Sequence, residues 1–498
     1  MRRCLALVTA AAALCSVLLA GGSAATSAGA AATARAAAPA ATWGTAAEIP
    51  GSNRLNKGGQ AGIGSVSCAT STVCSAGGSY TTAFIAGVPT VQAFVVNKTG
   101  GTWRKAEQVP GTATLNAGGR ARTTSLSCSA AGSCSAGGYY ADASGRQQAF
   151  VVSEAAGTWG TAAEVPGTAG LNQGSPGAAI TSLSCSAAGN CSAGGYYTDA
   201  SGRQQAFVVS ETGGSWGTAA EVPGTAALNA GGRAATSSVS CAAGGCSAGG
   251  YYASSATDGI PVTQAFVVSE TGGTWGTAAE VPGTAALNGG GYAVITSVSC
   301  ATAGNCSAGG QYTGSTPATE AFVVSETGGS WGTAAEVPGI AALNQRRLAQ
   351  VNSVSCPTAG NCVAVGFYED AAFDNQAFVV NETAGTWGTA EEVPGTAALD
   401  QGGPGAVTAS VSCSAVGDCS AGGYYSGTPG VEQAFVVSET GGTWGSAEEV
   451  PGTAVLNAGG LAATQSVSCA PAGTCIAGGQ YKNSNSAIEV FVVNETGS

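Results

Sequence analysis

Residues Ser182–Asn229 read SLSCSAAGNCSAGGYYTDASGRQQAFVVSETGGSWGTAAEVPGTAALN, and close variants of this pattern recur along the chain. Each copy carries one tryptophan, and successive tryptophans lie 60, 56, 57, 59, 56, 56 and 57 residues apart. The eight are Trp43, Trp103, Trp159, Trp216, Trp275, Trp331, Trp387 and Trp444. Self-similarity at a period of this size is typical of solenoids and propellers. The repeat therefore limits the architecture to these two classes.

Four segments of the quoted repeat have the composition of short β-strands, and turn residues separate them. The first ends at Cys185, the second is Cys191–Tyr197, the third is Gln205–Ser210 and the fourth is Trp216–Pro223. Four strands in about 57 residues is the size of one propeller blade.

The two ends of the chain are complementary. The repeats begin with a fourth-strand segment, Thr42–Pro50, and end after a third-strand segment, Val490–Thr496. A stacked β-solenoid would instead need distinct end caps. Pairing the two ends closes a ring and removes both open sheet edges. We therefore predict an all-β, eight-bladed β-propeller of four-stranded blades in residues 42–498, closed by the N-terminal strand pairing with the last blade.

Three recurring features resemble the kelch repeat of galactose-oxidase-like propellers: a Gly-Gly doublet late in the second strand, an aromatic residue after it, and a tryptophan that opens the fourth strand. The doublets are Gly77-Gly78, Gly137-Gly138, Gly194-Gly195, Gly249-Gly250, Gly309-Gly310, Gly422-Gly423 and Gly478-Gly479. The chain departs from the family in having Val365-Gly366 in the sixth repeat, and valines such as Val152 where kelch repeats usually show a tyrosine. The resemblance implies the fold only, because the histidine ligands of galactose oxidase have no counterpart here.

Residues 1–36 have the pattern of a secretory signal peptide, and residues 37–41 follow as a short linker. Met1-Arg2-Arg3 precedes an apolar run, Leu5–Ala20, and the last Ala-x-Ala cleavage candidate ends at Ala36. The apolar run is too short to indicate a membrane span. We expect a secreted, extracellular protein whose mature chain does not insert into a membrane.

Charge and composition exclude several classes of function. Removing Arg2, Arg3 and Arg35 leaves 13 basic side chains against 28 acidic ones, a net charge of −15. Such a chain is a poor ligand for the phosphates of nucleic acid. The absence of histidine removes the usual general base and the commonest transition-metal ligand. We predict no nucleic-acid partner, no cofactor and no metal.

Sixteen cysteines form pairs that flank the hairpin between the first two strands of each repeat. The pairs are Cys68/Cys74, Cys128/Cys134, Cys185/Cys191, Cys241/Cys246, Cys300/Cys306, Cys356/Cys362, Cys413/Cys419 and Cys469/Cys475. Facing residues of a hairpin come close enough to bridge, and disulfides are the expected state in a secreted chain. Metal-binding thiolates would instead need four convergent ligands. We predict eight disulfides within blades.

The recurring tryptophans and tyrosines each have both a structural and a functional interpretation. The tryptophans would suit sugar stacking, but packing between blades explains one at the same place in every repeat. The tyrosines that close the second strand have the same interpretation, with more room for function because their hydroxyls lie near a loop. They are Tyr80, Tyr140, Tyr197, Tyr252, Tyr312, Tyr368, Tyr425 and Tyr481.

Glutamates two residues before the recurring proline are the carboxylates that a glycosidase would use. They are Glu48, Glu164, Glu221, Glu280, Glu336, Glu392 and Glu449, with Gln108 in the remaining repeat. An acid and a base about 5–10 Å apart would suffice for glycoside hydrolysis. A ring of near-identical positions on an outer strand is instead typical of edge protection.

The differences between repeats point to one face of the predicted propeller. In a propeller, the loop joining strands two and three shares a face with the loop joining each blade to the next. These loops hold most of the basic residues, namely Arg54, Lys57, Arg120, Arg122, Arg146, Arg203, Arg233, Arg346, Arg347 and Lys482. They also hold Asp142, Asp199, Asp258, Glu369, Asp370, Asp374, Asp400 and Glu432. We call this surface the loop face.

Blades one and four have longer loops than the others, Thr81–Val91 and Ala253–Thr263. These loops add apolar residues beside basic ones, a combination that marks contact sites. We predict that both loops border the principal ligand site. The predicted ligand-binding residues are Phe84, Ile85, Ile260, Arg120, Arg122, Arg233, Arg346 and Arg347.

These patterns favour non-catalytic recognition of a glycan or another extracellular or cell-envelope polymer through the loop face. Repeated weak sites on similar blades would add their avidity. One alternative is a carboxylate-dependent glycosidase or polysaccharide lyase, which a unique acid pair near the axis would favour. Another is a structural or adhesive scaffold that binds proteins.

Overall fold

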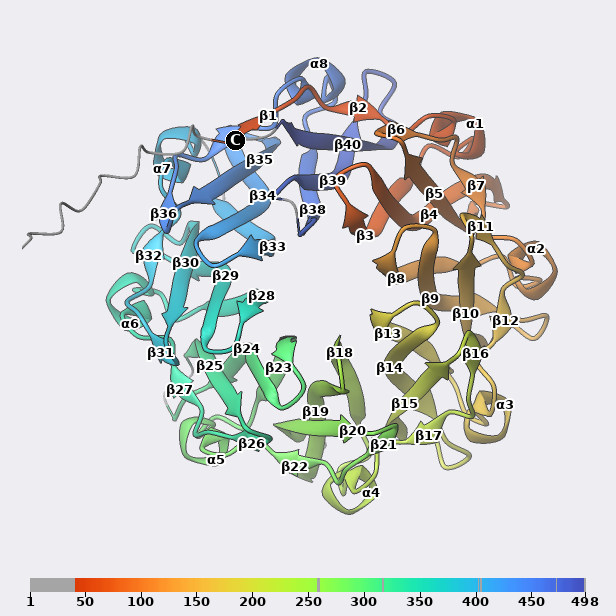
Figure 1. Ribbon diagram of the computed structural model, residues 1–498, viewed down its shortest axis with the longest axis vertical. Coiled ribbons are helices and arrows are strands. Elements are labelled where there is room, and N and C mark those ends of the chain that lie inside the picture. Colours follow the sequence, from red (N-terminus) through yellow and green to blue (C-terminus); the bar gives the residue numbers. More distant parts are fainter. Residues whose placement is uncertain are drawn as a thin grey trace, which may run out of the picture. The chain divides into compact units, whose positions relative to one another are not determined.

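The computed structural model describes residues 41–257, 260–315, 318–401, 403, 405–471 and 473–496. Eight antiparallel sheets stand around a central axis (Figure 1). The first blade consists of β3 (Ala61–Thr70), β4 (Val73–Ile85), β5 (Val88–Thr99), β6 (Thr102–Trp103) and β7 (Glu107–Gln108). Strand β3 is innermost, and both β6 and β7 pair with β5. The predicted eight-bladed propeller is confirmed.

The same plan repeats in blades 2–8. Blades 2 and 3 comprise β8 (Arg122–Ala130), β9 (Ser133–Ala141), β10 (Gln147–Ala155), β11 (Thr158–Trp159), β12 (Ala163–Glu164), β13 (Ala179–Ala187), β14 (Asn190–Thr198), β15 (Gln204–Thr212), β16 (Ser215–Trp216) and β17 (Ala220–Glu221). Blades 4 and 5 comprise β18 (Ala234–Ala242), β19 (Gly245–Thr257), β20 (Ile260–Thr271), β21 (Thr274–Trp275), β22 (Ala279–Glu280), β23 (Ala293–Thr302), β24 (Asn305–Thr313), β25 (Thr319–Thr327), β26 (Ser330–Trp331) and β27 (Ala335–Glu336). Blades 6 and 7 comprise β28 (Ala349–Thr358), β29 (Asn361–Glu369), β30 (Asn375–Thr383), β31 (Thr386–Trp387), β32 (Glu391–Glu392), β33 (Ala406–Ala415), β34 (Asp418–Thr428), β35 (Val431–Thr440), β36 (Thr443–Trp444) and β37 (Glu448–Glu449). Blade 8 comprises β38 (Ala462–Cys469), β39 (Cys475–Lys482), β40 (Ile488–Thr496), β1 (Thr42–Trp43) and β2 (Ala47–Glu48).

Blade 8 is built from both ends of the described chain. Strand β1 pairs antiparallel with β40, with Trp43 opposite Glu495, and β2 pairs with the same strand, with Glu48 opposite Phe491. Both ends of the described chain therefore lie in the same blade (Figure 1). The predicted closure by the N-terminal strand is confirmed.

Two details of the predicted strands are wrong. The fourth strand is not one segment such as Trp216–Pro223 but two dipeptides, because β16 and β17 pair with β15 on either side of an unpaired stretch. The long loops of blades 1 and 4 are mostly strand, since β4 runs to Ile85 and β5 begins at Val88. Both long loops are therefore extended hairpins.

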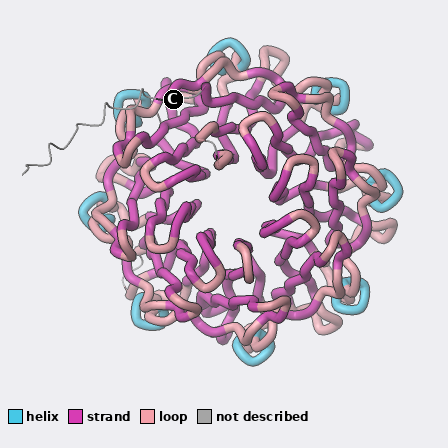
Figure 2. Tube along the Cα trace, in the orientation of Figure 1, coloured by secondary structure: helices cyan, strands magenta, loops and turns pink. Residues whose placement is uncertain are grey.

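A one-turn helix follows each outer strand and lies at the rim of the ring (Figure 2). The helices are α1 (Ser52–Leu55), α2 (Thr112–Leu115), α3 (Thr168–Leu171), α4 (Thr225–Leu228), α5 (Thr284–Leu287), α6 (Ile340–Leu343), α7 (Thr396–Leu399) and α8 (Thr453–Leu456). The residue before each helix is a glycine with φ between 80° and 89°. The glycine of the recurring Pro-Gly dipeptide is therefore needed, because the backbone at this position has a left-handed conformation.

The hydrophobic core is divided among the seams between neighbouring blades. At the seam of blades 3 and 4, Ala206 and Val208 pack with Val239, Tyr252 and Phe266. The glycine doublet permits this close approach, because a Cβ on Gly194 would meet Thr236 of the next blade. One phenylalanine in the third strand of each blade is buried, and these residues are Phe94, Phe150, Phe207, Phe266, Phe322, Phe378, Phe435 and Phe491.

The innermost strands are joined by serine hydroxyls around the axis. At every seam, the backbone N–H of the first cysteine of a pair donates to a serine Oγ of the preceding blade at 2.9–3.0 Å, as Cys241 does to Ser184. The recurring Ser-x-Ser-Cys sequence therefore joins each blade to the next.

All eight predicted disulfides are present, each across the hairpin between the first two strands of a blade, with Cα–Cα distances of 3.9–4.1 Å. Disulfides in this number are typical of proteins from oxidising compartments. No helix in the described part of the chain has the length and apolar character to cross a membrane. The predicted signal peptide lies outside the described residues.

Candidate binding face

Direct backbone contacts bring the two variable loop classes together on one face. The third strand of each blade begins beside the loop that enters the next blade, as in the parallel bridges between Val91 and Arg120 and between Gln204 and Arg233. The amide of Val91 donates to Gly119 O at 2.8 Å, and that of Ala121 donates to Val91 O at 3.0 Å. Each variable loop therefore extends across a seam.

The recurring tyrosines and outer-strand glutamates bond to each other. Tyr197 Oη donates to Glu221 Oε2 at 3.0 Å, and Tyr481 Oη donates to Glu48 Oε2 at 3.0 Å across the chain closure. Four further blades show the same contact at 2.8–3.2 Å. Burial raises the pKa of these tyrosines, and that of Tyr80, without a glutamate partner, rises to about 12. These glutamates thus have a specific structural partner in addition to their place on an edge strand.

The tryptophans pack in the seams, and most also bond across them. Trp216 Nε1 donates to Ser153 Oγ of the preceding blade at 3.1 Å, and Trp43 Nε1 donates to Ser438 Oγ at 3.2 Å. The structural interpretation of the tryptophans accounts for these contacts without a ligand.

The disulfide cysteines belong to the buried frame of the propeller and not to its binding face. Four of their sulfurs lie 3.3–3.5 Å from a serine Oγ of a neighbouring blade, as Cys246 Sγ does from Ser192 Oγ at 3.5 Å. The sequence groups these cysteines with the candidate site residues, but the second cysteine of each pair is buried in the structure. The buried second cysteines are Cys74, Cys134, Cys191, Cys246, Cys306, Cys362, Cys419 and Cys475.

A second ring of carboxylates lies at the end of the third strand, and its members are not among the residues predicted from the sequence. Glu211 is buried, and it accepts from Ser153 Oγ at 2.6 Å and from Ser135 Oγ at 2.8 Å, both in the preceding blade. The equivalent residues are Glu154, Glu270, Glu326, Glu382, Glu439 and Glu495, with Lys98 in blade 1. The recurring Ser-Glu-Thr sequence was the signal that could have identified this ring.

Three of the predicted arginines are free for a ligand. Arg120, Arg122 and Arg233 are exposed, and the guanidinium groups of Arg120 and Arg122 have no partner among the described residues. The guanidinium carbon of Arg233 lies 5.8 Å from the centre of the Tyr251 ring. By contrast, Arg146 and Arg203 donate to backbone carbonyls of the next loop. Two of the five arginines in this region are therefore structural.

The long hairpin of blade 1 projects apolar side chains from the loop face. Phe84, Ile85 and Val88 are 53%, 68% and 62% exposed. A register shift after Thr81 changes the direction of the hairpin. At this shift, Thr82 Oγ1 donates to Thr90 O at 3.1 Å. Blade 4 repeats this device, with Ser254 Oγ donating to Val262 O at 3.2 Å. The side chain of Ile260 lies outside the described residues.

Arg346 and Arg347 are not brought together with the other predicted arginines. They enter blade 6, on the opposite side of the ring from blade 2 (Figure 1). Arg346 Nε donates to Ala371 O at 2.9 Å, and its guanidinium carbon lies 4.0 Å from the centre of the Phe373 ring. The predicted ligand-binding set therefore falls into two separate groups.

Partly buried tyrosines accompany Arg120, Arg122 and Arg233, and they are not among the residues predicted from the sequence. Tyr139, Tyr196 and Tyr251 occupy one register position near the loop-face end of the second strand in three successive blades. Tyr196 Oη accepts from Gln147 Nε2 at 2.9 Å, and Tyr251 Oη accepts from Gln204 Nε2 at 3.3 Å. The doubled Tyr-Tyr of these repeats was the available signal.

Asp400 stands where the other seven blade connections have asparagine, and its environment is unfavourable for a carboxylate. At the connection from blade 3 to blade 4, Asn229 Nδ2 donates to Gln205 Oε1 of blade 3 at 2.8 Å. At the equivalent place, Asp400 Oδ1 and Gln376 Oε1 are both buried without a hydrogen-bond partner. Gln376 Nε2 donates instead to Asp370 Oδ2 at 3.1 Å. Turning the Gln376 amide so that it donates to Asp400 would leave Asp370 without this bond, so one of the two carboxylates always lacks the Gln376 donor. Burial, followed by the charge of Asp374, raises the pKa of Asp400 to about 6.

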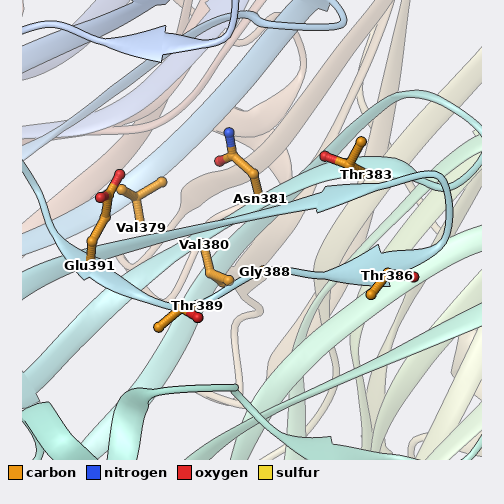
Figure 3. Close-up of a pocket in the computed structure, with 8 residues that line it drawn as sticks. All are labelled: Val379, Val380, Asn381, Thr383, Thr386, Gly388, Thr389 and Glu391. Carbon is orange, nitrogen blue, oxygen red and sulfur yellow. The ribbon is translucent and has the colours of Figure 1, made fainter.

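Two pockets lie away from the predicted ligand-binding residues. One, of about 380 Å³, lies at the outer edge of blade 6 between β30 and the paired segments β31 and β32 (Figure 3). Thr383 and Thr386 lie near the turn joining β30 to β31, and Glu391 lies at the other end (Figure 3). The second, of about 130 Å³, is lined by residues of blades 6 and 7 that include Cys362 and Val416. Within the described residues, no group of three acidic or cysteine side chains is arranged to hold a metal ion.

Neither the protein-family models nor the curated proteins contain a match to this chain. Solved structures do match, at low similarity. Hadza microbial sialidase Hz136 is 13% identical with a TM-score of 0.38, over 70% of this chain and 72% of that one. A subtype N11 neuraminidase-like protein of A/flat-faced bat/Peru is 9% identical with a TM-score of 0.38, over 92% and 95%. The PL25 polysaccharide lyase Ulvanlyase is 10% identical with a TM-score of 0.39, over 74% and 90%.

These structural neighbours carry no argument about activity at such TM-scores, and the kelch resemblance stays a prediction. The side chains of the loop face are therefore the evidence that bears on function.

Proposed function

We propose that this is a secreted, non-catalytic binding protein that recognises a glycan or another extracellular polymer through the loop face. One observation carries the proposal: seven of the eight large hydrophobic side chains exposed in the described residues lie in the two loop classes of that face. They are Phe84, Ile85, Val88, Tyr292, Leu348, Phe373 and Val455. Exposed apolar side chains beside unpaired cations are typical of contact surfaces.

The rest of the molecule supports the same interpretation. The recurring tryptophans, tyrosines and both rings of glutamates are used in packing within and between blades. Evenly bonded repeats provide a rigid frame, and variable loops on such a frame are where binding residues concentrate.

A binding screen with hydrolysis monitored alongside tests the proposal. The purified mature protein would be presented with immobilised glycans and cell-wall polymers, and soluble fragments would be measured by reducing-sugar and unsaturated-uronate assays. We expect saturable binding without release of fragments. Fragment release that needs the intact protein would overturn the non-catalytic assignment.

Matched substitutions locate the site. Phe84→Ser with Ile85→Ser should weaken binding, because both side chains project from the loop face. Val416→Ser serves as the control, since Val416 is 53% exposed but lies in the turn between β33 and β34, at the opposite end of the strands from the loop face. Equal effects of the two changes would remove the loop face from the proposal.

A glycosidase or lyase is the second candidate, favoured by Asp400. Its raised pKa beside Asp370 and Asp374 resembles the separation of acid and base roles that such enzymes require. If this candidate holds, Asp400→Asn abolishes fragment release while leaving polymer binding intact. If release continues in that variant, Asp400 is not the acid.

A further inference from the structure

The charges of the loop face are divided between opposite sides of the ring. The loops of blades 2 and 3 and the connections flanking them hold Arg120, Arg122, Arg146, Arg203 and Arg233 against Asp142 and Asp199. Those of blades 6 and 7 hold Glu369, Asp370, Asp374, Asp400 and Glu432 against Arg346 and Arg347. We call these the basic sector and the acidic sector. Blades 2 and 3 stand across the axis from blades 6 and 7 (Figure 1).

The acids of the basic sector are already bonded within their own loops. Asp142 Oδ1 accepts from the amides of Ser144 and Arg146, and Asp199 Oδ1 accepts from those of Ser201 and Arg203. The charges of Arg120 and Arg122 remain without a partner among the described residues. This sector therefore presents unpaired positive charge to solvent.

An aromatic row runs through the same sector. Tyr139, Tyr196 and Tyr251 hold one register position, and Gln147 and Gln204 bond two of the hydroxyls across the seams. The hydroxyls are close enough that Tyr139 and Tyr251, after desolvation, add to the raised pKa of Tyr196. The equivalent residues in blades 5 and 8 are Gln311 and Gln480. All three tyrosines are partly exposed, and partly exposed aromatic rings are side chains on which sugar rings can stack.

The two long hairpins stand at either end of the row. Arg120 bridges Val91 at the base of the blade 1 hairpin. At the other end, the carbonyl of Arg233 accepts from the amide of Ala253, at the base of the blade 4 hairpin, at 2.8 Å. The sector is thus bounded along the ring by two raised hairpins, with a cation at the foot of each.

We propose that the ligand is an acidic polysaccharide, bound along the basic sector between the two hairpins, with its sugar rings on the tyrosines and its anionic groups on Arg120, Arg122 and Arg233. The proposal rests on the proposed function, since it names the polymer class and the sector used. The acidic sector repels the same ligand and confines it to one side of the face. A polysaccharide fits better than nucleic acid because three cations on a chain of net charge −12 match sparse anionic groups rather than one phosphate per nucleotide.

Binding of defined probes to the mature protein tests this. Polygalacturonate should bind more tightly than neutral dextran, and the difference should shrink as salt is raised. Arg120→Ala with Arg122→Ala should weaken polygalacturonate binding roughly tenfold, since both side chains are exposed and their loss leaves packing intact. Tighter binding of dextran sulfate would also support an acidic polysaccharide and would identify sulfate as the preferred group.

The tyrosine row has a matched control in blade 7. Tyr196→Gln places in blade 3 the residue that blades 5 and 8 already carry, so the fold should tolerate it, as unchanged melting would show. It should weaken polygalacturonate binding about fivefold, from the lost stacking. Tyr424→Gln removes the equivalent tyrosine from the acidic sector and should change nothing.

Three outcomes would overturn the inference: equal affinity for dextran and polygalacturonate, equal losses from Tyr196→Gln and Tyr424→Gln, or tighter binding of a single-stranded DNA oligonucleotide than of any polysaccharide. In the first two cases the proposed function stands and only the ligand class or sector fails. Binding of no polymer at all in the wider screen would overturn the proposed function itself.

Discussion

Blade 8 is assembled from the two ends of the described chain, whereas blade 3 is one continuous segment, and their contacts are nearly the same. In blade 3, Gly217 N donates to Ser210 O at 2.9 Å, and Ala219 N donates to Pro166 O at 2.7 Å. In blade 8, Gly44 N donates to Asn494 O at 2.8 Å, and Ala46 N donates to Pro451 O at 2.7 Å. Ring closure therefore uses the ordinary contacts of the repeat and needs no special device.

The blades differ in one buried contact at the seam between blades 8 and 1. Where Glu211 accepts from two serines of blade 2, Lys98 Nζ donates to Asn494 Oδ1 at 2.9 Å and to Ser71 O at 3.1 Å. Burial lowers the pKa of Lys98. The repeat thus tolerates a reversed direction of hydrogen bonding, provided that the partner is an amide that can turn.

Deleting Ala41–Gly51 should have the largest effect on the stability of the protein. The deletion removes β1 and β2, exposes the edge of β40 and opens the ring. We expect a loss of cooperative unfolding, or a melting temperature lower by about 10 °C or more, measured by calorimetry. Deleting residues 37–40 is the control and should have little effect. Melting of the first variant like the full-length protein would mean that blade 8 does not close the ring.

Glu211→Ala tests whether the buried carboxylate ring stabilises the seams. The change leaves Ser135 and Ser153 without their shared acceptor in a buried site. We expect a loss of about 2–4 kcal/mol in unfolding free energy from denaturant titration. Glu391→Ala, at the outer edge of blade 6, should cost far less. Equal costs would show that the ring contributes no more than a surface carboxylate.

Lys98→Glu tests whether the seam between blades 8 and 1 needs a lysine where the other seams have a glutamate. Asn97 and Asn381 already donate to the glutamates of the next blades, so Asn494 can turn its amide to do the same. We expect Lys98→Glu to change the unfolding free energy by about 1 kcal/mol or less, with Glu211→Lys much more destabilising because serines offer no fixed acceptor for a buried ammonium. If Lys98→Glu destabilises as much as Glu211→Lys, the closing seam needs its lysine.

Asp400→Asn restores the residue of the other blades at the connection into blade 7 and should have the smallest effect. The pKa of Asp400 rises from 3.8 to about 6 in the folded state, so its stabilising contribution is complete below pH 4 and lost as the pH rises through 6. The variant should melt about 1–2 °C higher at pH 8 and about equally at pH 4. A gain that is the same at both pH values would contradict the titration of Asp400.

The buried glutamates should make stability change with pH in the same direction as Asp400 does. Burial raises the pKa of Glu154, Glu439 and Glu495, with hydrogen bonds from neighbouring side chains opposing it. The folded state therefore holds these protons more firmly than the unfolded chain, and stability should decline as the pH rises above the ordinary glutamate pKa of 4.5. The chain has no histidine to offset this trend.

The blade number, the ring closure and all eight disulfides could be predicted from the amino-acid sequence alone. These depend on features that recur locally, namely the spacing of tryptophans such as Trp216, the hairpin around Cys185 and Cys191, and the strand segments at the two ends. The repeat length and the facing cysteines of a hairpin can be recognised without information on distant contacts, because each repeat forms the same local structure.

The pairs of side chains that meet across a seam could not be predicted from the sequence and became visible in the folded structure. Ser135 and Glu211 are 76 residues apart, and Tyr139, Tyr196 and Tyr251 share one register position although whole repeats separate them. The same holds for the arginines: Arg146 and Arg120 look alike in sequence, yet only Arg146 finds a carbonyl in the next loop. A side chain's partner across a seam depends on how neighbouring blades twist and pack, and local composition does not specify that geometry.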